Sequence, residues 1–306
     1  MSADAIAPVS GDPVSGDPVF RDVVSLGHKL DALRSEIERM GRAVVAFSGG
    51  ADSALVAHVA TNVLGPEGAL CVTAVSASLA PEELADCRAL AREWGLRWRA
   101  VETEELDDPD YVANGADRCY HCKASLLSAL TPLARAESAV VILGVNLDDL
   151  GDHRPGQDAA AERGARFPLV SAGLTKDDVR TVSRQLGLRT WDKPAAACLA
   201  SRLPYGTPVT LGTLSTVSTA ESALRALGFG QLRVRHYGDL ARLELNGTDL
   251  MTAVQRRHEV VAAVKAAGYR YVTLDLEGFR SGNLNLALTG VRGDTAMAMV
   301  DGPGAP

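Results

Sequence analysis

The sequence feature that most constrains the fold is a glycine-rich turn between an apolar run and a helical pattern. Residues 43–47 (AVVAF) are typical of a buried strand, and residues 48–53 (SGGADS) follow directly. Glycines let backbone amides approach an anion closely, and the free amides and dipole of a following helix favour phosphate. The GxxxxGK[ST] loop is excluded because its lysine is missing. The turn therefore predicts a phosphate-binding strand–turn–helix unit.

Strand-like and helix-like segments alternate after this unit. A capping-box pattern, Thr175 followed by Asp178, marks the start of one of the helices. This alternation predicts an α/β fold with a doubly wound parallel sheet, whose ligands bind at the carboxyl ends of the strands. Ser48, Ser76 and Gly144 are expected to gather there. Strands are expected at 43–47, 69–75, 97–102 and 139–144, and helices at 22–40, 52–64, 81–95, 119–135 and 175–187.

The pattern changes from about residue 210 to a smaller α+β arrangement. A helix to residue 227, strands at 231–237, 240–245 and 271–276, and a helix at 249–267 are expected. Prolines and small residues between 193 and 208 indicate the junction. We therefore expect a disordered tail at 1–20, a first domain at 21–193, a second, smaller α+β domain at 194–290 and a loose tail at 291–306.

Composition narrows the class of protein. The 306 residues are 46% hydrophobic and 23% charged, and no apolar run approaches the length that spans a membrane. The beginning of the sequence carries no secretory pattern, so cytoplasmic localisation is the expectation. The formal net charge of -7 argues against a broad nucleic-acid surface but leaves room for a local basic pocket. We expect neither a nucleic acid nor a membrane as a partner.

The five cysteines are too few for a disulfide framework, so each needs its own explanation. Cys71 lies in an apolar strand pattern and Cys87 in an amphipathic helix pattern, so both are expected in the core. Cys119 and Cys122 share a predicted helix start, which favours thiolates that could chelate a metal. Cys198 lies in a small-residue loop at the junction. Three cysteines could hold an iron–sulfur cluster, while a redox pair and a buried structural thiol at Cys198 remain the alternatives.

Two further patterns allow both a ligand site and a simpler explanation. The loop at 144–156 is rich in acids, so Asp52 and Asp149 could bind Mg²⁺ together with phosphate oxygens, or the loop could be merely solvated. Arg233 and Arg235 alternate on one predicted strand, so they face the same side and could bind a phosphate together. Alternating arginines also occur on exposed strands.

Five motifs taken together resemble the LarE family, a branch of the PP-loop ATP pyrophosphatase superfamily (adenine nucleotide α-hydrolase-like fold). LarE proteins are ATP-dependent sulfur transferases that mature a nickel-pincer nucleotide cofactor. The resemblance covers about residues 30–287, and the segment around Cys198 is its most specific part. The motifs are SGGADS at 48–53, RCYHCK at 118–123, NLDD at 146–149 with RPG at 154–156, PAAACLASRLPYG at 194–206 and EGFRSG at 277–282.

The resemblance implies a reaction and a set of site residues. A carboxylate of pyridinium-3,5-biscarboxylic acid mononucleotide would be adenylated by ATP, and sulfur would then replace AMP to give a thiocarboxylate. LarE relatives form homo-oligomers, which is expected here too. The resemblance implies Ser48, Gly49, Gly50, Asp52 and Ser53 for the pyrophosphate of ATP, Glu221, Arg233 and Arg235 for the pyridinium mononucleotide, and Cys198, Cys119 and Cys122 for sulfur. The predicted site further includes Ser76 and Gly144 for ATP, Arg202 for the pyridinium mononucleotide, and Asp52 and Asp149 for Mg²⁺.

The source of the sulfur separates two branches of the family. In one branch the distal cysteine gives up its own sulfur and becomes dehydroalanine; in the other a Cys-x-x-Cys pair joins that cysteine to hold a 4Fe–4S cluster. The presence of Cys119, Cys122 and Cys198 favours the cluster form, and sacrifice of Cys198 remains the alternative.

Two other functions remain open at this point. A PP-loop tRNA thiolation enzyme or amide synthetase would share the first domain, but a basic RNA-binding module or a glutaminase domain would be expected beside it. A non-catalytic nucleotide-binding regulator would share the fold as well. Such a regulator would bind ATP without releasing pyrophosphate and would not need Cys198.

Overall fold

The computed structural model describes residues 18–151, 155–194 and 196–280. The chain folds into two compact units: residues up to 111 with 117–197 form the first unit, and 112–116 with the residues from 198 onward form the second. Most of the predicted tail at 1–20 and all of that at 291–306 lie outside the described residues. Within the described residues, no helix is both long and apolar enough to cross a membrane.

The first unit is built on a four-stranded parallel sheet, as the alternating pattern predicts. Its spatial order is β3-β2-β1-β4, and every neighbouring pair is parallel. Parallel strands meet at a common carboxyl edge, so the segments after β1, β2 and β4 emerge on the same side of the sheet. The strands are β1 (Ala43–Ala46), β2 (Ala69–Val75), β3 (Trp98–Glu102) and β4 (Val140–Leu143).

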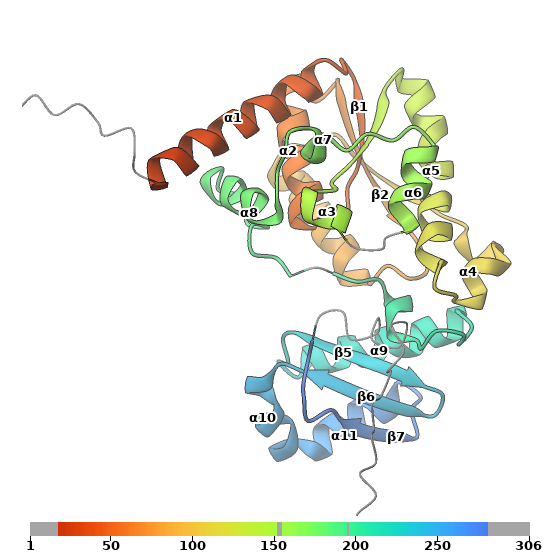
Figure 1. Cartoon of the computed structure of the whole chain (residues 1–306). Coiled ribbons are helices and arrows are strands. Elements are labelled where there is room, and N and C mark those ends of the chain that lie inside the picture. The colour runs from red at the N-terminus through yellow and green to blue at the C-terminus, as the bar shows by residue number, and fades with distance from the viewer. Residues whose placement is uncertain (1–17, 152–154, 195, 281–306) are drawn as a thin grey trace, which may run out of the picture. The chain divides into compact units, whose positions relative to one another are not determined.

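Helices cover both faces of this sheet (Figure 1). Val45 on β1 packs in a core with α2, whereas its neighbour Val44 packs in another core with α5. Because successive strand residues point to opposite faces, apolar residues at consecutive positions require a helical layer on each side. The helices are α1 (Pro18–Glu38), α2 (Ala51–Leu64), α3 (Pro81–Glu93), α4 (Pro109–Ala113), α5 (Arg118–Glu137), α6 (Pro155–Glu162), α7 (Pro168–Ser171) and α8 (Lys176–Gln185), with 3-10 turns η1 (Glu105–Asp107) and η2 (Leu147–Gly151).

Local sequence signals predict the start of α8 correctly, but they did not lead to the prediction of several short helices. The capping box before α8 is present: Thr175 Oγ1 accepts the Asp178 amide at 3.2 Å, and the Asp178 carboxylate accepts the Thr175 amide at 2.9 Å. The segment 104–117, where the sequence predicts no helix or strand, contains η1 and α4. Helix α6 was also missed, although a proline at its first position is a recognised start signal.

The second unit is a smaller α+β arrangement, with a three-stranded sheet of order β5-β6-β7. Strands β5 and β6 are antiparallel, and β7 is parallel to β6. The helix expected at 249–267 is wrong, because it breaks at Arg256, where the guanidinium donates to the Leu227 carbonyl at 2.7 Å. The elements are η3 (Leu199–Arg202), α9 (Leu211–Ala226), β5 (Leu232–Tyr237), β6 (Leu240–Leu245), η4 (Gly247–Asp249), α10 (Leu250–Gln255), α11 (Arg257–Ala266) and β7 (Tyr271–Leu274).

The two faces of strand β5 differ in chemistry. Leu232 and Val234 pack into the apolar core with α9 and α11. Arg233 and Arg235 alternate with them and therefore point to the other face. Both arginines are nonetheless buried, with 8% and 2% of their surface exposed. A buried basic face is unusual for a sheet, and it locates one of the two candidate sites.

Candidate active site

The glycine-rich turn joins β1 to α2 in the first unit. Gly49 adopts a φ of 68°, and a Cβ there would lie 2.9 Å from the Cys87 sulfur. Only glycine meets both demands without strain. Gly50 is the N-cap of α2, and no side chain caps this helix end. The first amides of α2 have no intrahelical acceptor, so they are available to an anion.

Hydroxyl groups and a second glycine hold the turn in place. Ser53 Oγ accepts the Ser48 amide at 3.2 Å and lies 3.0 Å from Ser48 Oγ. Gly144, just after β4, packs directly on the first turn of α2: a Cβ on it would lie 2.5 Å from the Ser53 amide nitrogen. Ser76 follows β2, and its hydroxyl lies 3.0 Å from Ser78 Oγ. The turn is thus supported from β4 across the carboxyl edge of the sheet.

The Asp52 carboxylate forms the polar end of this site. Its Oδ1 accepts Asn146 Nδ2 at 3.0 Å, and its Oδ2 accepts Lys176 Nζ at 2.5 Å. Asp149, the other predicted Mg²⁺ ligand, accepts the Asn146 amide at 3.1 Å. Asn146 therefore links the two predicted ligands. Sequence reasoning missed Lys176, although its place directly after the capping residue Thr175 put it at a helix start near the sheet edge.

A second lysine that the sequence analysis did not select lies beside the turn. Lys193 Nζ would be 3.8 Å from a Cβ on Gly49, and it donates to Glu83 at 2.8 Å and to Asp86 at 2.7 Å. Burial alone lowers the pKa of Lys193, but the hydrogen bonds that it donates to these two carboxylates, and their negative charge, outweigh burial and raise that pKa above its usual value. Lys193 is therefore a cation held next to the glycine turn.

The cysteines divide into buried and accessible groups. Cys71 and Cys87 are buried, as predicted, and burial raises the pKa of Cys71 to about 12. Cys119 is exposed and Cys122 is partly exposed on the first turn of α5. Thiols locked in the core are inert, whereas accessible thiols can bind a metal or react. The helical start that the sequence predicted for Cys119 and Cys122 is confirmed.

The backbone beside Cys119 is tightly packed against α6. A Cβ on Gly156 would lie 2.8 Å from the Cys119 carbonyl oxygen, so α6 approaches α5 closely at this turn. Tyr120 reaches the same helix, where its hydroxyl donates to Glu162 at 2.8 Å. These contacts position the turn of α5 that carries the two accessible cysteines.

In the second unit, the buried face of the sheet collects arginines around two glutamates. Glu221, on α9, accepts two bonds from Arg202, at 2.8 and 3.0 Å, and one from Arg225 at 2.9 Å. Glu221 also accepts the amide of Val234 at 3.1 Å, an edge group of β5. Both glutamates are fully buried, and each serves as a shared counter-ion. The second is Glu244 on β6, 2.9 Å from both Arg235 and Arg242.

Arg233 is the member of this group without a carboxylate. Among the described residues it makes no ion pair, and its guanidinium lies over the Phe279 ring at 4.8 Å. Burial, followed by repulsion from Arg202 and Arg235, lowers the pKa of Arg233 to about 10. Two buried glutamates therefore pair with four of the five arginines, and Asp275 lies 3.6 Å from one of these, Arg242. The arrangement has an excess of positive charge that an anion would neutralise.

Cys198 lies directly before η3 and belongs to the same unit as the arginines. Arg202 Nη1 donates to the Cys198 carbonyl at 3.1 Å and lies 3.1 Å from Ser201 Oγ. Arg235 Nη1 donates to the Ser201 carbonyl at 2.7 Å. The arginine group thus fixes the backbone that carries Cys198, whose side chain is partly exposed. Glu244 was not selected from the sequence, and the structure places it opposite Arg233 on the neighbouring strand.

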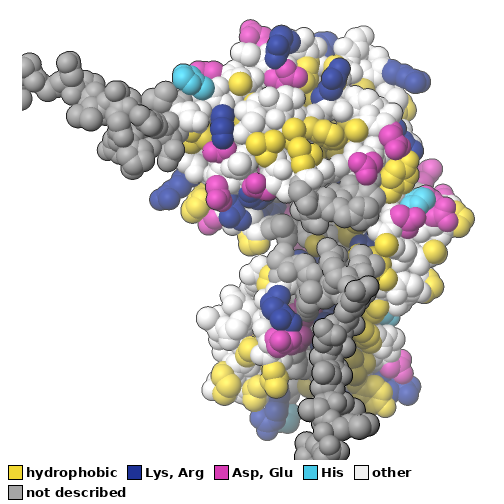
Figure 2. Space-filling model, in the orientation of Figure 1, with side chains coloured by type: hydrophobic (Ala, Val, Ile, Leu, Met, Phe, Trp, Pro, Cys, Tyr) yellow, Lys and Arg dark blue, Asp and Glu magenta, His cyan; other side chains and the backbone are white. Residues whose placement is uncertain are grey.

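On the one face of the molecule that Figure 2 draws, charged side chains of both signs are mixed rather than segregated. On the face drawn in Figure 2, lysine and arginine side chains alternate with aspartate and glutamate over the described residues. The arginine group carries excess positive charge in a chain whose formal net charge is -7.

Comparison with known proteins places the chain among enzymes with a related first unit. The NAD synthase family matches residues 26–113. A pyridinium-3,5-bisthiocarboxylic acid mononucleotide synthase of Lactiplantibacillus plantarum is 38% identical over 87% of this chain and 97% of its own length. Two uncharacterised proteins are also similar: one from Synechocystis sp. is 49% identical over 86% of this chain and 99% of its own length, and one from Methanocaldococcus jannaschii is 26% identical over 78% and 90%.

Proposed function

The chain belongs to the LarE family of pyridinium-3,5-bisthiocarboxylic acid mononucleotide synthases, and we propose that it uses ATP to activate a carboxylate of a pyridinium mononucleotide and then inserts sulfur into it. The observation that carries the proposal is the arginine group of the second unit. A mononucleotide carries one phosphate, and a phosphate dianion would neutralise the excess charge at Arg233. Arg202, Arg235 and Glu221 would hold the surrounding frame.

ATP would bind at the glycine turn of the first unit. Uncapped amides at the start of α2 and the left-handed Gly49 suit a pyrophosphate group. Lys176 and Lys193 add two cations close to that turn. Ser48 and Ser53 would hold the turn in shape, and Ser76 and Gly144 would line the same sheet edge.

The donor set also fits a magnesium ion bound with the nucleotide. Mg²⁺ prefers one or two carboxylates together with phosphate oxygens. Asp52 and Asp149 would supply the carboxylates, and Asn146, which bonds to both, would orient them. When bound, Mg²⁺ neutralises charge on the phosphates.

The chemistry follows from the weakness of a carboxylate as an electrophile. In the first step a carboxylate oxygen attacks the α-phosphorus of ATP, and the bond from that phosphorus to the bridging oxygen breaks, which releases pyrophosphate. In the second step a sulfur nucleophile attacks the carbonyl carbon, and AMP leaves with the electron pair of the broken C–O bond. A thiolate or sulfide is needed, because a neutral thiol is a poor nucleophile.

Cys119, Cys122 and Cys198 would handle the sulfur. Among the five cysteines these three are accessible, and three thiolates fit a 4Fe–4S cluster that keeps one iron open. When bound, such a cluster supplies an iron to which a sulfide can attach. The alternative within the family is transfer of the Cys198 sulfur itself.

The reaction is tested by incubating the full chain with ATP, Mg²⁺ and the biscarboxylate mononucleotide under anaerobic conditions. We expect pyrophosphate release that requires the mononucleotide, and a thiocarboxylate product detected by mass spectrometry. ATP binding without pyrophosphate release would contradict the proposal and favour a nucleotide-binding regulator.

Replacing Arg233 with glutamine is expected to raise the KM for the mononucleotide by about 10- to 100-fold, since a hydrogen bond to a charged group is worth about 1.5–3 kcal/mol. The melting temperature is expected to stay the same or rise, because the variant removes a buried cation that Arg202 and Arg235 repel. The matched control is Arg270→Gln in the same unit, whose side chain is 71% exposed. Equal losses in both variants, or an unchanged KM in Arg233→Gln, would contradict the phosphate assignment.

Replacing Lys193 with glutamine is expected to slow pyrophosphate release about tenfold, the effect of about 1.4 kcal/mol on a barrier. The cause is the loss of a cation beside the glycine turn. Arg189→Gln is the matched control, because Arg189 also binds Asp86, at 2.7 Å. If both variants release pyrophosphate at the same rate, Lys193 serves only the acidic cluster on α3.

We further propose that the protein forms homo-oligomers in the cytoplasm. Oligomer formation is supported by large apolar side chains of the second unit that are exposed in the single chain. These side chains are Leu211, Met251, Val254, Tyr271 and Leu276. Light scattering of the purified chain measures the oligomeric state. The domain division expected at residues 193 and 194 falls just before the boundary of the two compact units at residues 197 and 198, and residues 112–116, expected in the first domain, belong to the second unit.

A further inference from the structure

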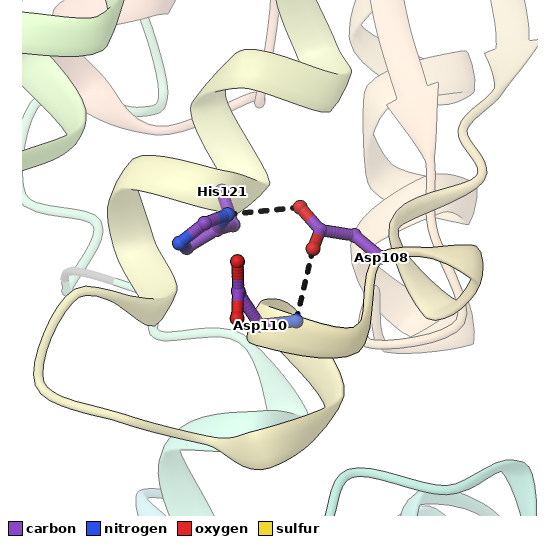
Figure 3. A group of neighbouring side chains, drawn as sticks. All are labelled: Asp108, Asp110 and His121. Atoms are coloured by element: carbon purple, nitrogen blue, oxygen red, sulfur yellow. Dashed lines mark hydrogen bonds and ion pairs between the residues drawn. The ribbon is translucent and has the colours of Figure 1, made fainter.

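A histidine and two aspartates converge beside the accessible cysteines, in the first unit. His121, on the first turn of α5, has its Nδ1 2.9 Å from Asp108 Oδ2. Asp110, on α4, offers a third ligand, and one donor atom of each residue lies within 4.8 Å of the others. Figure 3 shows the three side chains pointing toward a common point. The imidazole is mostly buried, with 17% of its side chain exposed.

The negative charge at this place exceeds what the imidazole of His121 can balance when protonated. Asp117 adds a third carboxylate, 3.6 Å from His121 Nε2. In the described part of the chain, no lysine or arginine pairs with Asp108 or Asp110. Three carboxylates around one imidazole favour a cation at their centre, because like charges at this range repel one another.

We propose that Asp108, Asp110 and His121 bind one divalent transition-metal ion of the Zn²⁺, Fe²⁺ or Co²⁺ class. An imidazole nitrogen with two carboxylate oxygens suits these ions, whereas Mg²⁺ and Ca²⁺ prefer oxygen ligands alone. Three protein ligands leave positions open for water. This site is separate from the one proposed for the iron–sulfur cluster, and it does not depend on the proposed sulfur transfer.

Helix geometry separates this site from the thiols. At about 100° per residue, the side chains of Cys122 and Cys119 project about 100° and 200° around α5 from that of His121. A metal ion held by His121 therefore takes no sulfur ligand from the same helical turn. The difference gives the two sites distinct spectra.

The location of the site suggests what a metal ion would do. The chain leaves the first unit after Tyr111, contributes residues 112–116 to the second unit, and returns at Asp117. Asp108 and Asp110 precede this excursion, and His121 follows it. A metal ion bound by all three would close the base of the excursion and restrict the free chain, as a cross-link does. It would also anchor the turn of α5 that carries Cys119 and Cys122.

Cobalt titration of the full-length Cys119→Ser/Cys122→Ser variant tests the proposal. We expect one equivalent of Co²⁺ to bind, with weak visible bands and no thiolate charge-transfer band, and Zn²⁺ to displace it. Asp110→Asn in the same background is expected to weaken Co²⁺ binding by at least about tenfold. Asp110 is exposed, so this substitution does not endanger the fold. Asp107→Asn, an exposed acid of the neighbouring turn, is the matched control and is expected to bind as before.

His121→Gln provides the second variant and should lose the visible bands. Proteolysis adds a structural readout, since Co²⁺ is expected to protect the segment 108–121 in the parent variant but not in Asp110→Asn. Absence of Co²⁺ binding, or equal binding by the Asp107→Asn and Asp110→Asn variants, would overturn the proposal. His121 would then be only an ion-pair partner of Asp108 and Asp117.

Discussion

Replacing Cys198 with alanine is expected to lower thiocarboxylate formation by at least about a thousandfold, the scale on which the loss of an indispensable active-site group acts, because Cys198 would be either a cluster ligand or the sulfur donor. Pyrophosphate release should continue, because the glycine turn lies in the other unit and the bond from Arg202 goes to the Cys198 carbonyl, which alanine retains. The measurement is product by mass spectrometry beside pyrophosphate by a coupled assay. Loss of both activities in a folded variant would contradict this separation of roles.

Visible absorption and intact mass identify the source of the transferred sulfur. Anaerobic reconstitution of the wild-type chain with iron and sulfide is expected to give a broad visible absorption that disappears in Cys119→Ala and Cys122→Ala. After turnover, the intact mass of the wild-type chain should be unchanged. A chain lighter by one H₂S after turnover would show that Cys198 gave up its own sulfur, and would contradict the cluster form.

The fold of the first unit could be predicted because the sequence signals for its strands and helices are local. Continuous apolar runs predicted strands buried on both faces, and the structure places a helical layer against each face. The Thr175 capping box needed only four adjacent residues. The break at Arg256 was not predicted; at this residue the guanidinium donates to the Leu227 carbonyl at the end of α9, a contact that no local pattern shows. Contacts between distant segments are not visible in a local pattern.

The residues of the candidate sites show the same difference between local signals and contacts that only the fold creates. The glycine turn was visible, since its residues are consecutive. Lys176 and Lys193 were missed because only the folded sheet brings them to the turn. The shared orientation of Arg233 and Arg235 followed from alternation, but their burial did not. Arg235 is buried beside the carboxylate of Glu244 on the neighbouring strand β6, and Arg233 is buried over the Phe279 ring; neither contact is visible in the local pattern of β5.

Replacing Gly144 with alanine is expected to slow pyrophosphate release by at least about 100-fold, since a displacement of about 1 Å at a reacting group costs that much. The new Cβ would lie 2.5 Å from the Ser53 amide nitrogen and 2.7 Å from the Asp52 carbonyl carbon. Both are backbone atoms, so no side chain can turn away to relieve the clash. The start of α2 must shift, and Asp52 and Ser53 shift with it. Overpacking of this kind is also expected to cost about 1–3 kcal/mol of stability.

The matched control separates the local clash from the general effect of adding a methyl group. Gly27, on α1, has nothing within 4 Å of an added Cβ. Gly27→Ala is therefore expected to leave pyrophosphate release unchanged and to raise stability by about 0.5–1 kcal/mol, since alanine is the better helix former. ATP affinity and melting temperature are measured for both variants. If Gly144→Ala binds ATP as the wild type does, β4 does not support the turn, and the glycine turn alone positions the nucleotide. A loss of ATP affinity in a variant that still melts cooperatively shows instead that the close approach of Gly144 to α2 fixes the geometry of the phosphate site.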